Sequence, residues 1–197
     1  RDSLQSLGEN VVYVQKWPWG GNEEYPWWKY MNRPQPTVDD LEEIRRRSNL
    51  AEAACFNVGF RNTIKYQKNN LSNTTIYGVS TDYDNIRSFD LAAGRFFSPF
   101  ELNAGRNLAV IGHNIAKDLF QGDDPIGKTM QIGGKKVNII GVFTKEGKSA
   151  IGEDSNDDLV LIPMEVAKSM VDFRRNGPWI MVKAKPKVDV ADLMDEL

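Results

Sequence analysis

The chain has 197 residues, the size of one domain or of one domain with a second inserted into it. Lys and Arg total 25 and Asp and Glu total 27, so the formal net charge is −2. This balance excludes nucleic-acid binding driven by phosphate neutralisation, which needs a basic surface. An aromatic content of 10 % excludes a disordered chain, because such chains are depleted in aromatic residues.

Residues for catalysis or metal binding are scarce. The single cysteine, Cys55, excludes an intrachain disulfide, and its apolar neighbours predict a buried, inert thiol. The single histidine, His113, excludes a His-rich metal centre and is expected at the surface or at a helix cap. We therefore assign no catalytic, cofactor-binding or metal-binding residue.

The apolar runs are short. The longest, residues 159–164, falls far below the roughly 20 residues that cross a membrane. The sequence begins at Arg1 rather than Met and ends at Leu197 within a helical pattern. Both ends predict a fragment of a longer protein, whose targeting or anchoring segments lie outside it.

An aromatic segment follows a predicted strand at 11–15. Residues 16–30 hold four of the five tryptophans with two prolines and two glycines, which exclude regular helix or central strand. Trp and Tyr side chains are typical of interfaces and sugar-binding platforms, and a small core of mutually packed rings is the alternative. The candidate partner contacts are Trp17, Trp19, Trp27, Trp28 and Tyr30.

The remaining elements are predicted from capping residues, turn residues and periodicity. Thr37 is expected to cap a helix with acids in its first turn and arginines in its last. In chain order we then expect strands at 52–60 and 62–67, a polar turn at 68–74, a strand at 75–79, a short helix at 82–89, a strand at 108–111, a helix capped by Asn114, a hairpin of 129–132 with 136–142, a polar loop at 145–157, a strand at 159–162, a short helix at 164–171 and a strand at 179–183.

The two ends of the chain carry a similar pattern. Residues 36–39 read Pro-Thr-Val-Asp and residues 186–189 read Pro-Lys-Val-Asp, each before an acidic amphipathic helix. The pattern predicts two strand–helix units flanking a central insertion of about 85–176.

Two motif matches are rejected. Residues 122–129 fit the phosphate-binding pattern G-x-x-x-x-G-K-T, but a helix precedes them and a strand follows, the reverse of what a phosphate loop needs. We expect a turn that enters a strand. The acidic run from Asp154 to Glu165 has the length of a calcium loop, but Leu159 stands where that loop needs glycine.

Six segments in order carry a family resemblance. They are 6–14 (SLGENVVYV), 77–83 (YGVSTDY), 91–97 (LAAGRFF), 108–112 (LAVIG), 124–129 (DPIGKT) and 137–142 (VNIIGV). In order and spacing they resemble the periplasmic core domain of MacB-like ABC-transporter permeases, a group that includes the lipoprotein-release and FtsX-type permeases. The tryptophan-rich segment is not part of the general pattern and resembles a subgroup elaboration.

The resemblance implies an α+β fold with two subdomains. A split βαβ subdomain, called Porter in this family, would comprise 1–84 plus 177–197, and a mostly-β insertion, called Sabre, would comprise 85–176. It also implies that ATP hydrolysis resides in a separate cytoplasmic nucleotide-binding domain, so that this domain is not an enzyme and needs no cofactor.

The implied function is mechanical. The domain would lie on the periplasmic side of the bacterial inner membrane and relay ATP-driven motion to a periplasmic partner or substrate, in efflux or lipoprotein export. Its partners would be the transmembrane helices and nucleotide-binding domain of the same transporter, a second permease copy, and a periplasmic adaptor or lipoprotein substrate. Two alternatives stay open: a free-standing periplasmic ligand-binding or adhesion domain, and a carbohydrate-active hydrolase that uses the tryptophan segment and a carboxylate pair.

Overall fold

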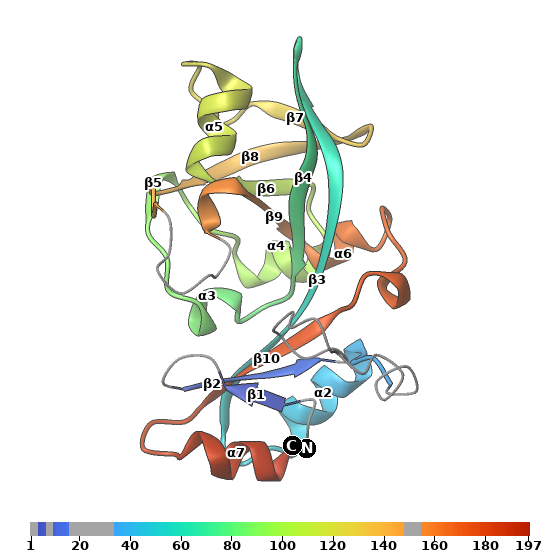
Figure 1. Ribbon diagram of the computed structural model, residues 1–197, viewed down its shortest axis with the longest axis vertical. Coiled ribbons are helices and arrows are strands. Elements are labelled where there is room, and N and C mark those ends of the chain that lie inside the picture. The colour runs from blue at the N-terminus through green and yellow to red at the C-terminus, as the bar shows by residue number, and fades with distance from the viewer. Residues whose placement is uncertain (1–3, 7–9, 16–33, 148–154) are drawn as a thin grey trace, which may run out of the picture.

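A computed structural model describes residues 4–6, 10–15, 34–147 and 155–197. Its ten strands are β1 (Leu4–Ser6), β2 (Val11–Gln15), β3 (Ala51–Tyr66), β4 (Asn69–Val79), β5 (Leu91–Gly94), β6 (Leu108–Ile111), β7 (Thr129–Ile132), β8 (Lys135–Phe143), β9 (Leu159–Pro163) and β10 (Trp179–Ala184). The helices are α2 (Val38–Arg47), α3 (Tyr83–Ile86), α4 (Pro99–Ala104), α5 (His113–Phe120), α6 (Met164–Ala167) and α7 (Val190–Glu196), with 3-10 turns η1 (Asn156–Asp158) and η2 (Phe173–Arg175). The fold is α+β, as predicted (Figure 1).

The upper half of the molecule in Figure 1 is a closed barrel. Its six strands pair in a ring, β3-β4-β9-β6-β8-β7 and back to β3. Alternate residues of each strand face the interior, where α5 adds Leu119 and Phe120 to a core that includes Ile64, Ile111 and Ile139. A second core, around Phe143 and Leu161, packs on the outside of the barrel under α3 and α4.

The lower half is a small sheet with two helices on one face (Figure 1). Strand β10 lies between β2 and β3 and pairs antiparallel with both. Both helices pack on that sheet through one core, to which α2 contributes Leu41 and α7 contributes Leu193. The predicted cap of α2 is confirmed, since Thr37 and Asp40 form a reciprocal capping box. The chain thus has a strand–helix unit near each end.

One long ribbon, β3 with β4, joins the two halves. The first part of β3 pairs with β10 from Ala51 to Asn57, and its far end pairs with β7 at Ile64 and Lys65. The prediction of two separate strands with a polar turn at 68–74 is wrong. The turn comprises only residues 67 and 68, and β4 begins at Asn69. The polar run forms a strand because most of its polar side chains face solvent, while Thr74 and Ile76 point inward.

Other boundaries also differ from the sequence prediction. Asn114 does not cap α5, because the helix begins earlier, after Gly112. A side chain at Gly112 would place its Cβ 2.1 Å from the carbonyl oxygen of Asn156, so this close approach requires glycine. Helix α4 was not predicted, and the helices at 82–89 and 164–171 are each only four residues long. The hairpin of β7 with β8 is confirmed, as is the turn that enters β7 from the G-x-x-x-x-G-K-T run.

Candidate interaction surface

The tryptophan-rich segment is bracketed by two described positions. The candidate contacts Trp17, Trp19, Trp27, Trp28 and Tyr30 lie outside the described residues. The chain enters that segment at Gln15, the last residue of β2, and returns at Pro34. Gln15 lies opposite Trp179, the first residue of β10. The segment therefore starts beside the junction between the small sheet and the barrel.

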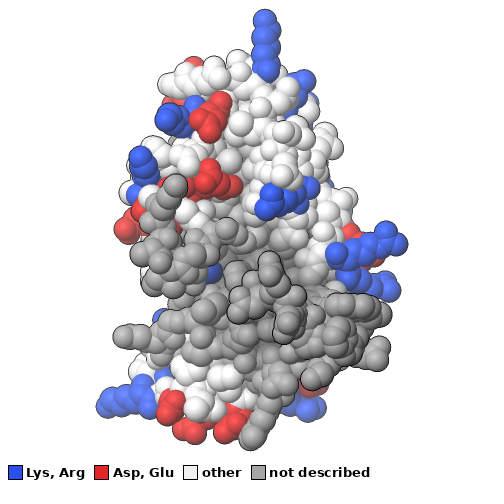
Figure 2. Space-filling model, viewed as in Figure 1, with Lys and Arg blue, Asp and Glu red and all other residues white. Residues whose placement is uncertain are grey.

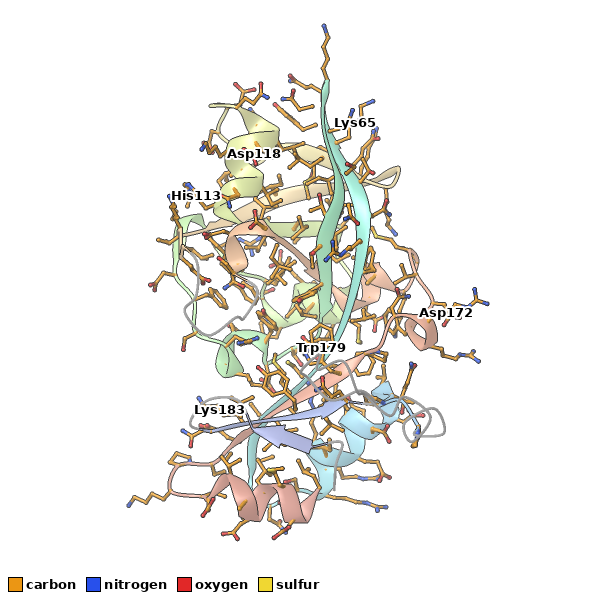
Figure 3. All side chains as sticks on the ribbon, viewed as in Figure 1. Lys65, His113, Asp118, Asp172, Trp179 and Lys183 are labelled. Carbon is orange, nitrogen blue, oxygen red and sulfur yellow. The ribbon has the colours of Figure 1, made fainter. Side chains whose placement is uncertain are left out.

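The junction itself is built from aromatic and buried polar side chains. The ring of Trp179 packs edge-on against Tyr77 of β4, with ring centroids 5.1 Å apart. Across the β3–β10 pairing, Trp179 lies opposite Asn57, whose side chain is fully buried. From such close packing we expect the two halves to resist rotation against each other. Figure 3 shows Trp179 between the barrel above and the small sheet below.

A turn between α6 and β10 presents two arginines. We call residues 172–177 the arginine knuckle. The side chains of Arg174 and Arg175 are 94 % and 87 % exposed. Asp172 caps η2 by accepting a hydrogen bond from the backbone N–H of Arg174 at 3.0 Å, and Asn176 Nδ2 donates to the carbonyl of Asp172 at 2.6 Å. Sequence reasoning missed this feature, because two adjacent arginines carry no distinctive spacing.

A carboxylate clamp connects the last helix to the base of β3. Glu196 of α7 accepts hydrogen bonds from the backbone N–H groups of Asn49 (2.6 Å) and Leu50 (3.1 Å) and from the hydroxyl of Ser48 (2.8 Å). The backbone N–H of Asn49 is the main cause of the lowered pKa of Glu196. Because β3 begins at Ala51, the clamp holds α7 to the start of the long ribbon.

A second clamp closes a loop beside the barrel. Asp157 accepts hydrogen bonds from the backbone N–H groups of Glu146 (2.8 Å) and Gly147 (2.9 Å), while Glu146 accepts two from Asn156. Burial raises the pKa of Asp157, but the two N–H groups and Ser155 together outweigh it and hold that pKa below its ordinary value. The clamp joins the chain on both sides of residues 148–154.

Two open grooves lie on the described surface. One, of about 720 Å³, adjoins α3 and the end of β8 and carries both acidic and basic side chains, including Asp84, Asp90, Glu146 and Lys145. The other, of about 490 Å³, lies between α2 and α7 and is lined partly by apolar side chains. Figure 2 shows one charged face of the molecule, on which acidic and basic side chains are interspersed. The first groove therefore carries charges of both signs, whereas the charged side chains that line the second, Asp40, Glu43 and Asp195, are all acidic.

The two residues singled out for reactivity, Cys55 and His113, lie in different settings. Cys55 is fully buried, and burial raises the pKa of its thiol to about 12, which confirms the prediction of an inert thiol. His113 is the first residue of α5 and is half-buried. Over the described ranges, no three His, Cys, Asp or Glu residues converge in a way that could hold a metal ion. Within those ranges there is also no helix with the length and apolar character needed to cross a membrane.

The architecture matches solved extracytoplasmic domains of transporters. Over 95 % of this chain and 79 % of the other, it superposes on the periplasmic region of MacB from Actinobacillus actinomycetemcomitans with a TM-score of 0.73 and 14 % sequence identity. It superposes on the extracellular domain of the ABC-type transporter YknZ from Gram-positive bacteria with a TM-score of 0.63 and 22 % identity, over 79 % and 76 % of the two chains. The fold is therefore that of this class of domain.

The sequence identifies the family. The profile of the MacB-like periplasmic core domain matches residues 1–197, and the chain belongs to this family. It is 31 % identical over 194 residues, 96 % of this chain, to the macrolide export ATP-binding/permease protein MacB of Chlorobium luteolum. It is 29 % identical over 197 residues to the protein of that name in Bdellovibrio bacteriovorus. The chain spans only 28 % and 29 % of the length of these curated relatives.

Proposed function

We propose that this domain is the extracytoplasmic part of an ABC-transporter permease and relays ATP-driven motion to a periplasmic partner or substrate. The membership in the MacB-like periplasmic core domain family supports the class of protein. In this proposal the domain lies on the periplasmic side of the bacterial inner membrane. Its motor is a cytoplasmic nucleotide-binding domain of the same transporter, and the domain itself catalyses no reaction.

The observation that carries the relay is the continuous β3–β4 ribbon. Strand β3 runs for 16 residues without a break, from the small sheet into the barrel wall. The Glu196 clamp ties α7 to the start of that strand, and the packing of Trp179 on Tyr77 stiffens the junction. Displacement of α7 is therefore expected to move the barrel as part of one rigid body.

The same proposal assigns the two subdomains. In this assignment residues 1–84 plus 177–197 form the Porter-like subdomain and residues 85–176 form the Sabre-like insertion, and the β3–β4 ribbon of the former supplies two of the six barrel strands. The Porter-like subdomain would receive motion from the transmembrane helices. The insertion would deliver it to a second permease copy, an adaptor or a lipoprotein substrate.

We assign partner contact to the tryptophan-rich segment through Trp17, Trp19, Trp27, Trp28 and Tyr30. The support is compositional, since Trp and Tyr are enriched among the residues that dominate interface energies. Gln15, the described residue that precedes the segment, lies opposite Trp179 at the junction, which supports a segment that begins there. Replacement of all five by Ser is expected to reduce partner binding and leave ATP turnover unchanged.

Spin-label distances in the full-length permease test the relay. One pair of labels, at Lys68 beside the barrel and Lys187 before α7, reports motion within a copy, and labels at Lys68 in two copies report motion between them. We expect the first distance to stay constant and the second to change when ATP binds. A constant distance between copies, or a change confined to the first pair, would refute the relay.

A further inference from the structure

We propose that the arginine knuckle, residues 172–177, is a docking site for an acidic, extended segment of a periplasmic partner protein. This inference rests on the proposed function, because it names the chemistry by which the domain would engage such a partner. Arg174 and Arg175 supply the recognition, and the remainder of the knuckle holds them in place.

The first argument is preorganisation. Phe173 anchors the knuckle, since its ring packs 5.8 Å from that of Phe56 and contacts both the barrel core and the small-sheet core. The Asp172 cap and the Asn176 hydrogen bond fix the backbone on either side. A turn fixed at both ends loses little conformational entropy when it binds, so its two arginines are well suited to recognition.

The second argument is the bonding capacity of the guanidinium groups. Each forms a long ion pair with Asp172, in which a guanidinium nitrogen lies 4.0 Å from a carboxylate oxygen, beyond hydrogen-bond distance. Across the ranges that the structure covers, neither guanidinium donates a hydrogen bond to a protein acceptor. Both guanidinium groups therefore lie in solvent with N–H donors that no acceptor in the described part of the chain uses. A planar guanidinium can bind one carboxylate through two parallel hydrogen bonds.

The third argument is the electrostatic field that the charged side chains near the knuckle produce. Lys168 precedes it, and Lys135 reaches the same connection from the β7–β8 hairpin by donating to Ser169 Oγ at 2.5 Å. Glu165 is already paired with Lys168 at 2.8 Å. Figure 2 shows cationic side chains projecting from this edge of the molecule. Four cationic groups (Lys135, Lys168, Arg174, Arg175) thus stand against two carboxylates (Glu165, Asp172), and the net positive charge of the surface is suited to attract an anionic segment.

Location favours a protein over a membrane. Figure 3 shows Asp172 on the flank, between Lys65 at one end of the long axis and Lys183 towards the other. A flat bilayer at either end of the molecule would not reach this flank, whereas an extended peptide would. The knuckle ends next to Trp179, which faces Gln15, where the aromatic segment begins. Trp, Tyr and Arg are the residue types that dominate interface hot spots.

A binding assay on the 197-residue chain tests the inference. The probe is a fluorescein-labelled decapeptide that alternates Glu and Ser, with a Lys–Ser peptide as the charge-reversed control, read by fluorescence anisotropy. We expect the Glu–Ser peptide alone to bind, and Arg174→Glu with Arg175→Glu to weaken binding by about tenfold or more, as for loss of two charge-assisted contacts. Arg174→Lys with Arg175→Lys should give an intermediate loss, because the charge stays and the fork is removed.

The matched control is Arg46→Glu with Arg47→Glu on α2. These arginines are also adjacent and exposed, but Arg46 donates a hydrogen bond to Glu43 at 3.1 Å and Arg47 forms an ion pair with the same carboxylate at 3.6 Å, shorter than the 4.0 Å pairs of Arg174 and Arg175. An equal loss in this control, no binding of the Glu–Ser peptide, or binding only to anionic phospholipid vesicles overturns the inference. The inference is also overturned if the chain self-associates and the charge reversal at Arg174 and Arg175 abolishes that self-association. None of these outcomes bears on the proposed relay of motion, which the ATP-dependent spin-label distances test separately. Circular dichroism verifies that each variant is folded.

Discussion

The Asp157 clamp makes a quantitative prediction about stability. Asp157 is only 4 % exposed and accepts hydrogen bonds from the backbone N–H groups of Glu146 and Gly147. Replacement by Ala leaves both N–H groups without their acceptor. Glu146 is exposed and Gly147 half-buried, so water replaces part of what is lost. Since a hydrogen bond to a charged group contributes about 1.5–3 kcal/mol and two are removed, Asp157→Ala is expected to lower the free energy of unfolding by about 3 kcal/mol.

Urea denaturation followed by tryptophan fluorescence measures this loss. Asp157→Asn keeps one carbonyl oxygen and should show about half of it, or ~1.5 kcal/mol. The matched control is Asp158→Ala, because Asp158 is exposed and accepts one hydrogen bond from Asn114 at 3.0 Å. A loss below about 1 kcal/mol at Asp157, or an equal loss at Asp158, would refute the reasoning.

The same clamp gives the protein a pH dependence of known sign. The pKa of Asp157 is lower in the folded chain than in the unfolded chain, because hydrogen bonds to the carboxylate outweigh burial. Its contribution to stability is therefore complete above the ordinary Asp pKa of about 3.9 and is lost as the pH falls through the folded value. Asp157→Asn should remove this part of the acid dependence, which urea midpoints between pH 7 and pH 3 measure.

Three further predictions concern the core, the thiol and the other clamp. Gly78→Ala would place a Cβ 2.6 Å from that of Ala167, so this overpacking should lower stability by about 1–3 kcal/mol in thermal unfolding. The thiol of Cys55 should react with a thiol reagent only when the chain unfolds, because it is buried and its pKa is raised to about 12, and fast labelling of the native chain would contradict this. Glu196→Ala should speed hydrogen exchange at the amides of Asn49 and Leu50, whereas the neighbouring Asp195→Ala should not.

Local signals in the sequence predicted local structure well. The capping box at Thr37 depends on residues three positions apart, and the turn between β7 and β8 depends on two glycines, Gly133 and Gly134. Both are decided within a few residues, so no distant partner is needed. The family was also evident from six short segments in order, although each is weak by itself.

The errors lie where distant partners decide the outcome. The polar run 69–74 has the composition of a turn, but it continues as β4 because β3 pairs with it along its length. The start of α5 is fixed by the contact between Gly112 and the chain near Asn156, more than forty positions away. Composition and periodicity do not contain such pairings.

The features of the candidate interaction surface also divide into those evident from the sequence and those that depend on distant contacts. The sequence by itself determined the family, through six ordered motifs, and the resemblance to that family implied the α+β class. The unusual tryptophan segment is evident from composition alone. Only the tertiary structure decided the closure of the barrel, the continuity of β3 between the halves, the Glu196 clamp and the exposure of the Arg174 and Arg175 side chains. The physical reason is that strand pairing and side-chain contact depend on groups far apart in the chain, whose meeting is fixed by burial of the whole core.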